Sequence, residues 1–350
     1  MNSLLSTTMS NNATDLHLCA GSKPIMRISS KLVPIEGEER LDPILLKKIA
    51  HHYLDDAKYD QLLKYKSVDL SYSKQNFGRF RCNFYLQRGS IACAIRSLPL
   101  QIPDIGTLGL PENCGSLLNK SKGLILIAGA TGSGKSTTLA SMIQQLNSNY
   151  SYHITTIEDP VEFLHRHDKS LVTQKEIGPD ALNFASALRA SLREDPDVIM
   201  LGEMRDYESI SIALTAAETG HLVLSTIHTN GAVKAIDRIL DSFPTEQHAQ
   251  TRSQLASVLE GIISQQLVPK KDGSGLVLAS ELLIVTPAVR NLIREGKHYQ
   301  IKNLIQNGAN SGMQSIERCL SQLYKNGVIE YEEAKLRAND HQLLETYCKV

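Results

Sequence analysis

Short apolar runs alternate with helical segments in the second part of the chain. The runs GLILIAG at 123–129, DVIMLGE at 197–203 and HLVLSTIH at 221–228 are separated by segments such as FASALRASLRE, in which apolar residues recur every three or four positions. This alternation is typical of a largely parallel sheet with helices on both faces. We therefore expect an α/β domain over residues 117–350.

Residues 1–98 have a different pattern, in which strands predominate. A helix is predicted to begin after the capping residue Asp42, with Pro43 at its first position. The tripeptide 88–90 predicts a turn between two strands. The predicted strands or hairpins cover 15–21, 25–35, 67–73, 78–87 and 91–97. Together these elements indicate a mixed α+β domain.

Two further segments complete the predicted organisation. Residues 99–116 carry prolines and glycines without a clear period, which is typical of a linker. After His228 the pattern is mostly helical. One expected helix presents an apolar face made of Leu255, Val258, Leu259 and Ile262. A second ends at Gly327 and presents Met313, Ile316, Leu320 and Leu323.

The composition is that of an ordinary globular protein. The chain has 350 residues, more than one core usually supports, of which 42% are hydrophobic and 21% charged. Lys and Arg number 37, as do Asp and Glu, so net charge gives no argument for a nucleic-acid partner. No apolar run approaches the ~20 residues that span a bilayer, and the N-terminus lacks a signal-peptide pattern. The six cysteines form no CxxC pair, so we expect reduced thiols in a cytosolic protein and no zinc site.

At the end of the first apolar run, nine residues have the composition of a phosphate-binding loop. They are Gly129, Ala130, Thr131, Gly132, Ser133, Gly134, Lys135, Ser136 and Thr137. Glycines let the backbone curl so that its N–H groups face phosphate oxygens, and the start of the next helix adds its dipole. Lys135 is expected to reach the β- and γ-phosphates and Ser136 to hold Mg²⁺. A glycine turn at a helix start is the plainer alternative.

Acidic residues follow two of the predicted strands. Glu158 and Glu162 come just after one strand, and Glu203 closes another. The carboxyl ends of parallel strands face the ligand crevice of an open sheet, where a carboxylate holds Mg²⁺ or orients the attacking water. A solvated acidic turn is the alternative for the first pair.

Two histidines lie at the ends of one predicted strand. His228, at the carboxyl end, is placed to contact a γ-phosphate or a carboxylate, whereas a hydrogen-bonded buried histidine is the alternative for His221. Arg79 and Arg81 share one face of another predicted strand, and Arg88 lies in the turn after it. An arginine supplied in trans stabilises the negative charge that develops during phosphoryl transfer. For each of these arginines, a position on a solvated strand face is the alternative.

Long stretches of the chain match motifs of one known family. They are GATGSGKSTT, TIEDPVEF, FASALRASLREDPDVIMLGEMRD and LGEMRDYESISIALTAAETGHLVLSTIHTN, with ATDLHLCAGSKPIMRI near the N-terminus. Together they resemble the secretion-type hexameric ATPases, and within them the retraction ATPases of type IV pili. The retraction signature AIRNLIRE is present at 288–295 with one change, from isoleucine to Val289. The resemblance covers nearly the whole chain.

The resemblance implies a role for each singled-out residue. Glu162 corresponds to the family's catalytic glutamate, and Glu203 to an atypical Walker B glutamate, which accounts for the missing aspartate there. His221 and His228 correspond to the histidines of its His box. The nucleotide-contacting arginines of its N-terminal domain correspond to Arg79, Arg81 and Arg88, without an indication of which one makes the contact. In the signature helix, we expect Arg290 and Arg294 to be needed for retraction but not for the fold or for ATP binding. The alternative is an amphipathic helix that packs through Leu292 and Ile293 and leaves Arg290, Arg294 and Glu295 solvated.

The resemblance also implies an architecture and a function. The fold would be a PAS-like N-terminal domain and a RecA-like core with a helical C-terminal tail, assembled as a homohexameric ring that binds ATP and Mg²⁺. The ring would power pilus retraction from the cytoplasmic side of the inner membrane. Its partners would be a platform protein (PilC-like) and an accessory retraction ATPase (PilU-like). The chain lacks the tetracysteine insert and the longer N-terminal region of the extension and type II secretion motors.

Three other functions stay open at this point. A nucleic-acid translocase shares the RecA-like ring, although zero net charge and 5% aromatic residues weigh against it. A secretion or effector-export ATPase shares the same site chemistry, so motifs do not separate it. A nucleotide-binding scaffold with negligible hydrolysis is the alternative that is not a motor.

Overall fold

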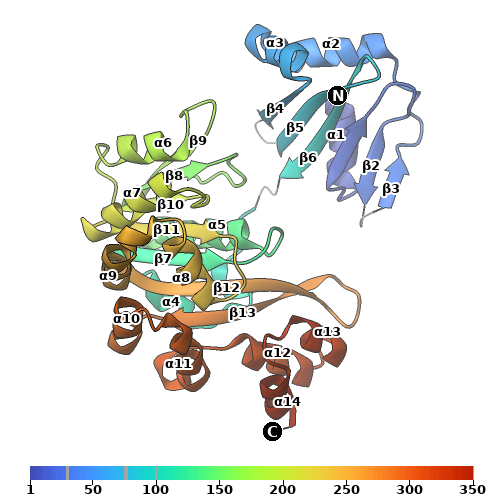
Figure 1. The fold of residues 1–350 in the computed structure, drawn as a ribbon. Coiled ribbons are helices and arrows are strands. Elements are labelled where there is room, and N and C mark those ends of the chain that lie inside the picture. The colour runs from blue at the N-terminus through green and yellow to red at the C-terminus, as the bar shows by residue number, and fades with distance from the viewer. Residues whose placement is uncertain (29–30, 75–77, 99–100, 350) are drawn as a thin grey trace. The chain divides into compact units, whose positions relative to one another are not determined.

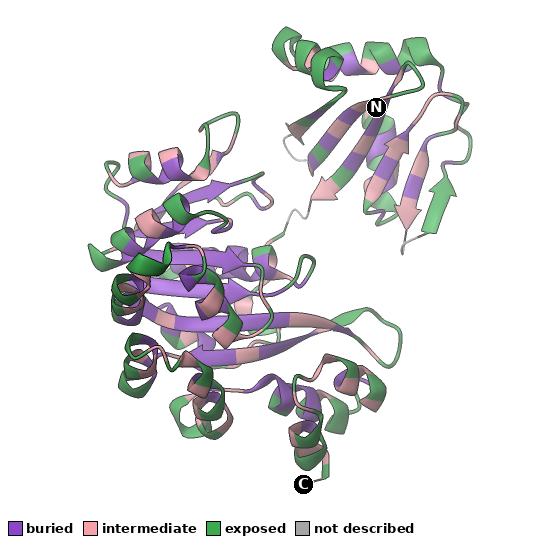
Figure 2. Ribbon diagram, in the orientation of Figure 1, coloured by how far each residue is buried: buried purple, intermediate pink, exposed green. Residues whose placement is uncertain are grey.

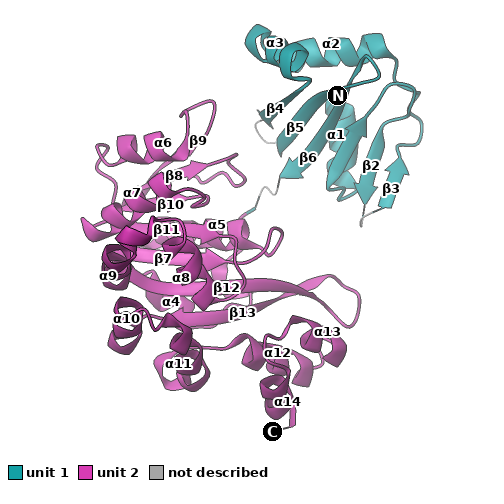
Figure 3. Ribbon diagram, in the orientation of Figure 1, with its two compact units in different colours: residues 1–101 teal, residues 102–350 magenta. Residues whose placement is uncertain are grey.

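The computed structural model describes all residues except 29–30, 75–77, 99–100 and 350, and its chain forms two compact units, 1–101 and 102–350 (Figure 3). The segment expected to be a linker, 99–116, begins outside the described residues. From residue 102 it belongs to the second unit, where it forms a 3₁₀ turn, η1 (Ile105–Thr107), and a short helix, α4 (Cys114–Leu117). Cys114 and Leu117 are buried in that unit's core, so this part of the segment is packed chain.

In the described part of the first unit, three helices accompany a six-stranded antiparallel sheet. Its strand order is β3-β2-β1-β6-β5-β4. The elements are α1 (Asn2–Ser10), β1 (Asp15–Leu18), β2 (Ile25–Ile28), β3 (Lys31–Pro34), α2 (Pro43–Tyr53), α3 (Asp56–Tyr65), β4 (Ser67–Lys74), β5 (Gly78–Gln87) and β6 (Ser90–Leu98). The sequence pattern did not predict α1 or α3. Apolar residues of all three helices share one buried cluster with the sheet.

Local sequence signals account for several of these elements. The Asp42 carboxylate accepts a hydrogen bond of 2.6 Å from the Leu45 N–H, which caps α2 one residue before Pro43. Arg88 and Gly89 both have positive φ, 48° and 76°, and join β5 to β6 by a two-residue turn. Along β5, Phe80, Cys82 and Phe84 are buried on one face, as the alternation predicts.

The second unit is built on a seven-stranded sheet of order β13-β12-β7-β11-β10-β8-β9 (Figure 1). The strands are β7 (Gly123–Ala128), β8 (His153–Glu158), β9 (Leu171–Glu176), β10 (Val198–Leu201), β11 (Leu222–Ile227), β12 (Leu259–Pro269) and β13 (Leu276–Ile284). The strands from β12 to β9 pair in parallel, and only β12 with β13 is antiparallel. The unit is therefore the mainly parallel α/β structure that the sequence predicts.

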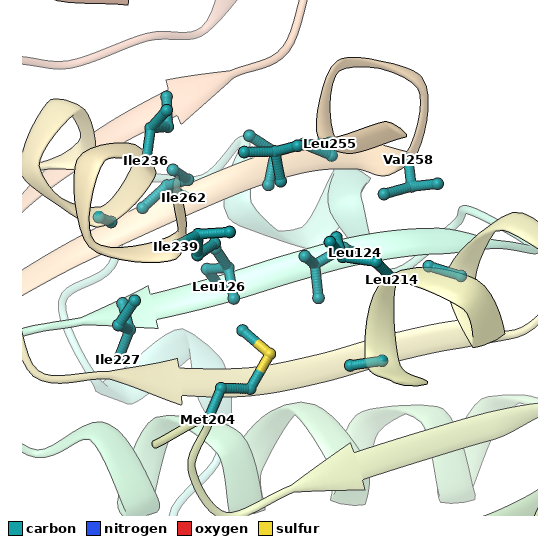
Figure 4. Packing of buried hydrophobic residues seen from close by; sticks show 14 of the residues in the cluster. Leu124, Leu126, Met204, Leu214, Ile227, Ile236, Ile239, Leu255, Val258 and Ile262 are labelled. Atoms are coloured by element: carbon teal, nitrogen blue, oxygen red, sulfur yellow. The ribbon is translucent and has the colours of Figure 1, made fainter. Parts of the chain in front are cut away.

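Helices cover both faces of this sheet. They are α5 (Lys135–Asn149), α6 (Phe184–Ser191), α7 (Tyr207–Glu218), α8 (Ala232–Leu240), α9 (His248–Val258), α10 (Pro287–Arg294), α11 (Ile301–Asn307), α12 (Ile316–Lys325), α13 (Tyr331–Arg337) and α14 (His341–Lys349). Alternate residues of β7 face opposite ways: Ile125 and Ile127 pack with α4 and α5, while Leu124 and Leu126 pack with α7, α8 and α9 (Figure 4). Strands β7, β10 and β11 are buried along their whole length (Figure 2).

The structure corrects two predicted helices. Helix α9 ends at Val258, and Leu259 and Ile262 belong to strand β12, because this segment pairs with β7 on one side and β13 on the other. The two ladders satisfy its backbone groups, which outweighs a local helical pattern. Helix α12 begins at Ile316, so Met313 precedes it and is buried in a different cluster. Gly327, with φ 69°, follows the end of that helix as expected.

Among the residues that the structure describes, no helix combines the length and the apolar character needed to cross a bilayer.

Candidate nucleotide site

The loop between β7 and α5 has the curled backbone that a phosphate cradle requires. Gly129, Gly132 and Gly134 have φ of 152°, 79° and 88°, values that residues with a Cβ rarely adopt. At Gly129, an added Cβ would lie 2.4 Å from the Ser133 hydroxyl oxygen and 2.6 Å from the Gln265 carbonyl oxygen. Glycine is therefore required there on both conformational and steric grounds.

Lys135, the first residue of α5, points back into the loop. Its buried ammonium donates hydrogen bonds to the carbonyl oxygens of Gly129 at 2.9 Å and Ala130 at 2.8 Å. Burial lowers the pKa of this amine, while the charges of Glu203 and Glu162 act in the opposite direction. The cation thus lies inside the loop and within electrostatic reach of both carboxylates. The remaining loop hydroxyls differ in exposure: Thr131 and Ser136 are exposed, Thr137 is half-buried and Ser133 is buried.

Glu203 follows β10 and contacts His228, which in turn lies next to the loop. Its carboxylate pairs with the exposed Arg205 guanidinium on one side, and His228 Nε2 lies 3.3 Å from its Oε2 on the other. The second ring nitrogen of His228, Nδ1, lies 3.5 Å from the Thr131 hydroxyl. Burial and the nearby Lys135 charge lower the pKa of His228, so we assign it as neutral at pH 7, with Nε2–H donating to Glu203.

Glu158 and Glu162 lie at the carboxyl end of the neighbouring strand, β8, and have different environments. Glu158 is buried and its Oε1 accepts hydrogen bonds from the Thr156 hydroxyl at 2.8 Å and the Gln174 amide at 3.2 Å. Burial raises the pKa of Glu158 to about 7 against these hydrogen bonds. Glu162 is half-buried, close enough to Lys135 to act on its pKa.

The other sequence-predicted residues are a histidine of the second unit and three arginines of the first unit. His221 is at the amino end of β11, about 20 Å from His228 by strand rise, and its Nδ1 is 3.0 Å from the Ala216 carbonyl oxygen. Within one chain, His221 is therefore the hydrogen-bonded histidine of the alternative interpretation. Arg79 and Arg81 share the partly exposed face of β5, where Arg79 donates to Ser73 and Arg81 lies 3.9 Å from Asp69. Arg88 is exposed in the turn that follows.

In the signature helix α10, Arg290 is neither solvated, as the alternative has it, nor without a role in the fold, as we expected. Its mostly buried guanidinium donates to the carbonyl oxygens of Ala256 and Ser257 and to the Glu260 carboxylate. This inward position arises because α9 ends directly beside α10 and leaves carbonyls without helical partners. Arg294 and Glu295 are exposed, as the alternative has them.

Sequence reasoning missed two glutamines that support the site. Gln174 of β9 bonds to Glu158, as described, and Gln265 of β12 donates a 2.7 Å hydrogen bond to the Thr138 hydroxyl, in the first turn of α5. Each is a single amide within a strand, and no spacing rule marks it. Only strand order, which brings β9 beside β8 and β12 beside β7, places them there.

The curled loop, the lysine inside it and the carboxylates on adjoining strand ends are the parts with which P-loop NTPases bind and cleave a triphosphate. Fold and site together therefore define a P-loop ATPase. The family described as Type II/IV secretion system protein matches residues 94–276, and the chain belongs to this family.

Known proteins similar to this chain include two from Pseudomonas aeruginosa. The type IV pilus retraction ATPase PilT is 42% identical over 340 residues, covering 96% of this chain and 97% of its own, and the type IV pilus ATPase PilU is 37% identical over 97% and 90%. The crystal structure of the pilus retraction motor PilT with bound ADP superposes with a TM-score of 0.93, at 46% identity, over 99% of both chains.

Proposed function

We propose that this chain is a motor that hydrolyses ATP to retract type IV pili and so drives twitching motility. The observation that carries the proposal is the similarity to PilT along the whole chain, together with the signature AVRNLIRE at 288–295. PilU, an accessory retraction ATPase, is the nearest alternative, and the retained signature favours the retraction motor itself.

The residues of the loop supply the nucleotide contacts in this proposal. The triphosphate lies against the N–H groups of the loop, and Lys135 exchanges its two loop carbonyls for β- and γ-phosphate oxygens. Glu162 orients the attacking water and accepts its proton, because it is half-buried and its charge acts on the pKa of Lys135. Glu203 holds the His228 imidazole beside Thr131, where the ring contacts the γ-phosphate when ATP is bound.

Magnesium fits the same site. Mg²⁺ needs only one or two carboxylates or hydroxyls besides phosphate and water, and Ser136 and Glu203 offer these at the first turn of α5 and the end of β10. Within the described part of the chain, no three His, Cys, Asp or Glu side chains converge as a metal site of their own. Glu158 fits less well, because burial, a raised pKa and two hydrogen bonds already engage it. The ion would neutralise phosphate charge during cleavage.

The working assembly in this proposal is a homohexameric ring in the cytoplasm, attached peripherally at the inner membrane beneath the pilus. Arg79, Arg81 or Arg88 of one unit would contact the nucleotide bound by the other unit or by a neighbouring subunit. Closure around ATP and reopening after hydrolysis would rotate the two units of each subunit, moving a platform protein of the pilus. An accessory retraction ATPase is a further partner.

ATP turnover and motility test the proposal together. Purified protein is expected to hydrolyse ATP, with Lys135→Ala abolishing nucleotide binding and Glu162→Ala abolishing turnover while binding persists. A deletion strain is expected to carry many pili and to lose twitching motility, with wild-type but not Glu162→Ala protein restoring it. Normal twitching in the deletion strain would point to a secretion ATPase. DNA-stimulated turnover with steep salt dependence would point to a translocase, and absent wild-type turnover to a scaffold.

A further inference from the structure

The connection from β8 to β9, residues 159–170, carries Glu162 and is held in an unusual way. Parallel neighbouring strands are usually joined through a helix, but these twelve residues, all of which the structure describes, contain neither helix nor strand. The buried part of such a connection, which has no ladder, must satisfy its backbone groups by other means. Side chains of β9 and α5 supply these partners.

The side-chain amide of Gln174 bonds to the backbone of this connection as the peptide group of a neighbouring strand would. Its Oε1 accepts the His165 N–H at 2.8 Å, and its Nε2 donates to the Phe163 carbonyl oxygen at 2.9 Å and to Glu158 Oε1 at 3.2 Å. The orientation of the amide is fixed, since only its oxygen can accept from a backbone N–H. One side chain therefore bonds to Glu158, before Glu162 in the chain, and to Phe163 and His165, after it.

Side chains of β9 hold residues on both sides of Glu162. The Glu176 carboxylate accepts the Val161 N–H at 3.2 Å, and the Gln174 amide donates to the Phe163 carbonyl oxygen. Gln174 also donates to the Glu158 carboxyl group, whose pKa the Glu162 backbone lowers. Gln174 therefore acts on this segment both directly and through Glu158.

We propose that Gln174 is a positioning residue for Glu162, acting through the backbone on both sides of it and through Glu158. The inference rests on the proposed function, in which Glu162 orients the attacking water. Hydrolysis depends steeply on this geometry, and a displacement of about 1 Å costs on the order of a hundredfold in rate. The amide bonds to protein groups of this connection and of Glu158, so we expect it to govern turnover and to leave ATP affinity to the phosphate loop.

The chain offers a matched control for this proposal. Asn147 of α5 holds the far end of the same connection in the same manner, donating to the Arg166 carbonyl oxygen at 2.7 Å and accepting the Asp168 N–H at 3.2 Å. Asn147 is buried, and the residues that it holds lie four and six positions beyond Glu162. We therefore expect Asn147→Leu to loosen the connection without displacing Glu162.

Steady-state ATPase kinetics on the full chain tests the inference, at a temperature below the melting points of all variants. Gln174→Leu is expected to lower kcat about tenfold to a hundredfold with the ATP KM within about threefold, whereas Asn147→Leu keeps kcat within about threefold. Equal losses of kcat in the two leucine variants, or a rise in KM alone, would overturn the proposal.

An exchange of the two groups gives a second test. Gln174→Glu sets a carboxylate against Glu158 and the Phe163 carbonyl, and is expected to lower kcat strongly. Adding Glu158→Gln restores a donor and an acceptor between the two positions and is expected to recover part of the loss; no recovery counts against the pairing. If Glu162→Ala itself turns over normally, the proposed function fails, whereas an inactive Glu162→Ala with a fully active Gln174→Leu defeats only this inference.

Discussion

The guanidinium of Arg290 lies 2.5 Å from Oε1 of Glu260, the residue at which β12 bulges out of register with β7. The other oxygen of this carboxylate lies 3.1 Å from the Lys120 ammonium, and the Glu260 side chain covers Gly123 at the start of β7. The signature helix α10 is therefore attached by an ion pair to the strand pair that leads to the phosphate loop.

Arg290 and Arg294 are expected to differ sharply when replaced by alanine. Arg290→Ala leaves the Glu260 charge, only 12% exposed, without its closest partner and uncovers carbonyls at the end of α9, so we expect a loss of about 2–4 kcal/mol in the free energy of unfolding. Arg294→Ala changes an exposed residue and should cost less than about 0.5 kcal/mol. Chemical denaturation measures both. Equal stability of the two variants would show that the Arg290 contacts contribute nothing.

Gly129 and Gly132 test the shape of the phosphate loop. A methyl group at Gly129 meets Ser133 and the Gln265 carbonyl as well as an unfavourable φ, so Gly129→Ala is expected to abolish ATP binding and destabilise the fold by several kcal/mol, roughly 2–4. At Gly132 nothing lies within 4 Å of the added carbon, and only the backbone cost of about 1 kcal/mol remains. Nucleotide titration and thermal melting compare them. Similar ATP affinity in both would contradict the steric account.

Glu158 predicts a pH dependence of stability. Its pKa is raised from 4.5 to about 7 in the folded chain, so the folded state binds a proton that the unfolded state releases, and stability falls as pH rises from about 4.5 to 7. Glu158→Gln removes this ionisation. Relative to wild type, the variant should therefore gain up to about 3 kcal/mol between pH 4.5 and 8. Denaturation at several pH values measures the difference, and parallel pH curves would exclude an elevated pKa at this residue.

Glu203→Gln separates charge from shape at the end of β10. The amide keeps the contacts with Arg205 and His228 approximately in place but removes the negative charge near Lys135, so kcat is expected to fall about a hundredfold while melting changes little. Arg205→Gln, at a side chain that is 65% exposed, is the control and should change stability by less than about 0.5 kcal/mol. A Glu203→Gln protein with wild-type turnover would remove Glu203 from the catalytic group.

The sequence suffices for the parts of the fold that carry local signals. Apolar runs predicted β7, β10 and β11 because central parallel strands are buried on both faces, and the glycine pattern placed the loop between β7 and α5. Asp42 and Pro43 fixed the start of α2 in the same way. These features depend on neighbouring residues, and no distant segment is needed to interpret them.

The features that escaped prediction depend on distant partners. The residues LEGII at 259–263 fit either a helix or a strand, and only the ladders to β7 and β13 select the strand. The inward turn of Arg290 follows from the end of α9 beside it, more than thirty residues earlier in the chain. Gln174 is undistinguished in sequence, because its partners lie on another strand and in an irregular connection.

The side-chain anchoring of residues 159–170 limits how this connection can vary in length. Exposed loops usually accept inserted residues, but here Gln174 engages residues 163 and 165 and Asn147 engages residues 166 and 168, so the spacing between the anchors is set residue by residue. Inserting or deleting one residue between 161 and 166 would break an anchor or move Glu162 out of place. Length changes that preserve turnover should therefore fall in other loops, such as 270–275 between β12 and β13, where the hairpin extends beyond the rest of the sheet (Figure 1).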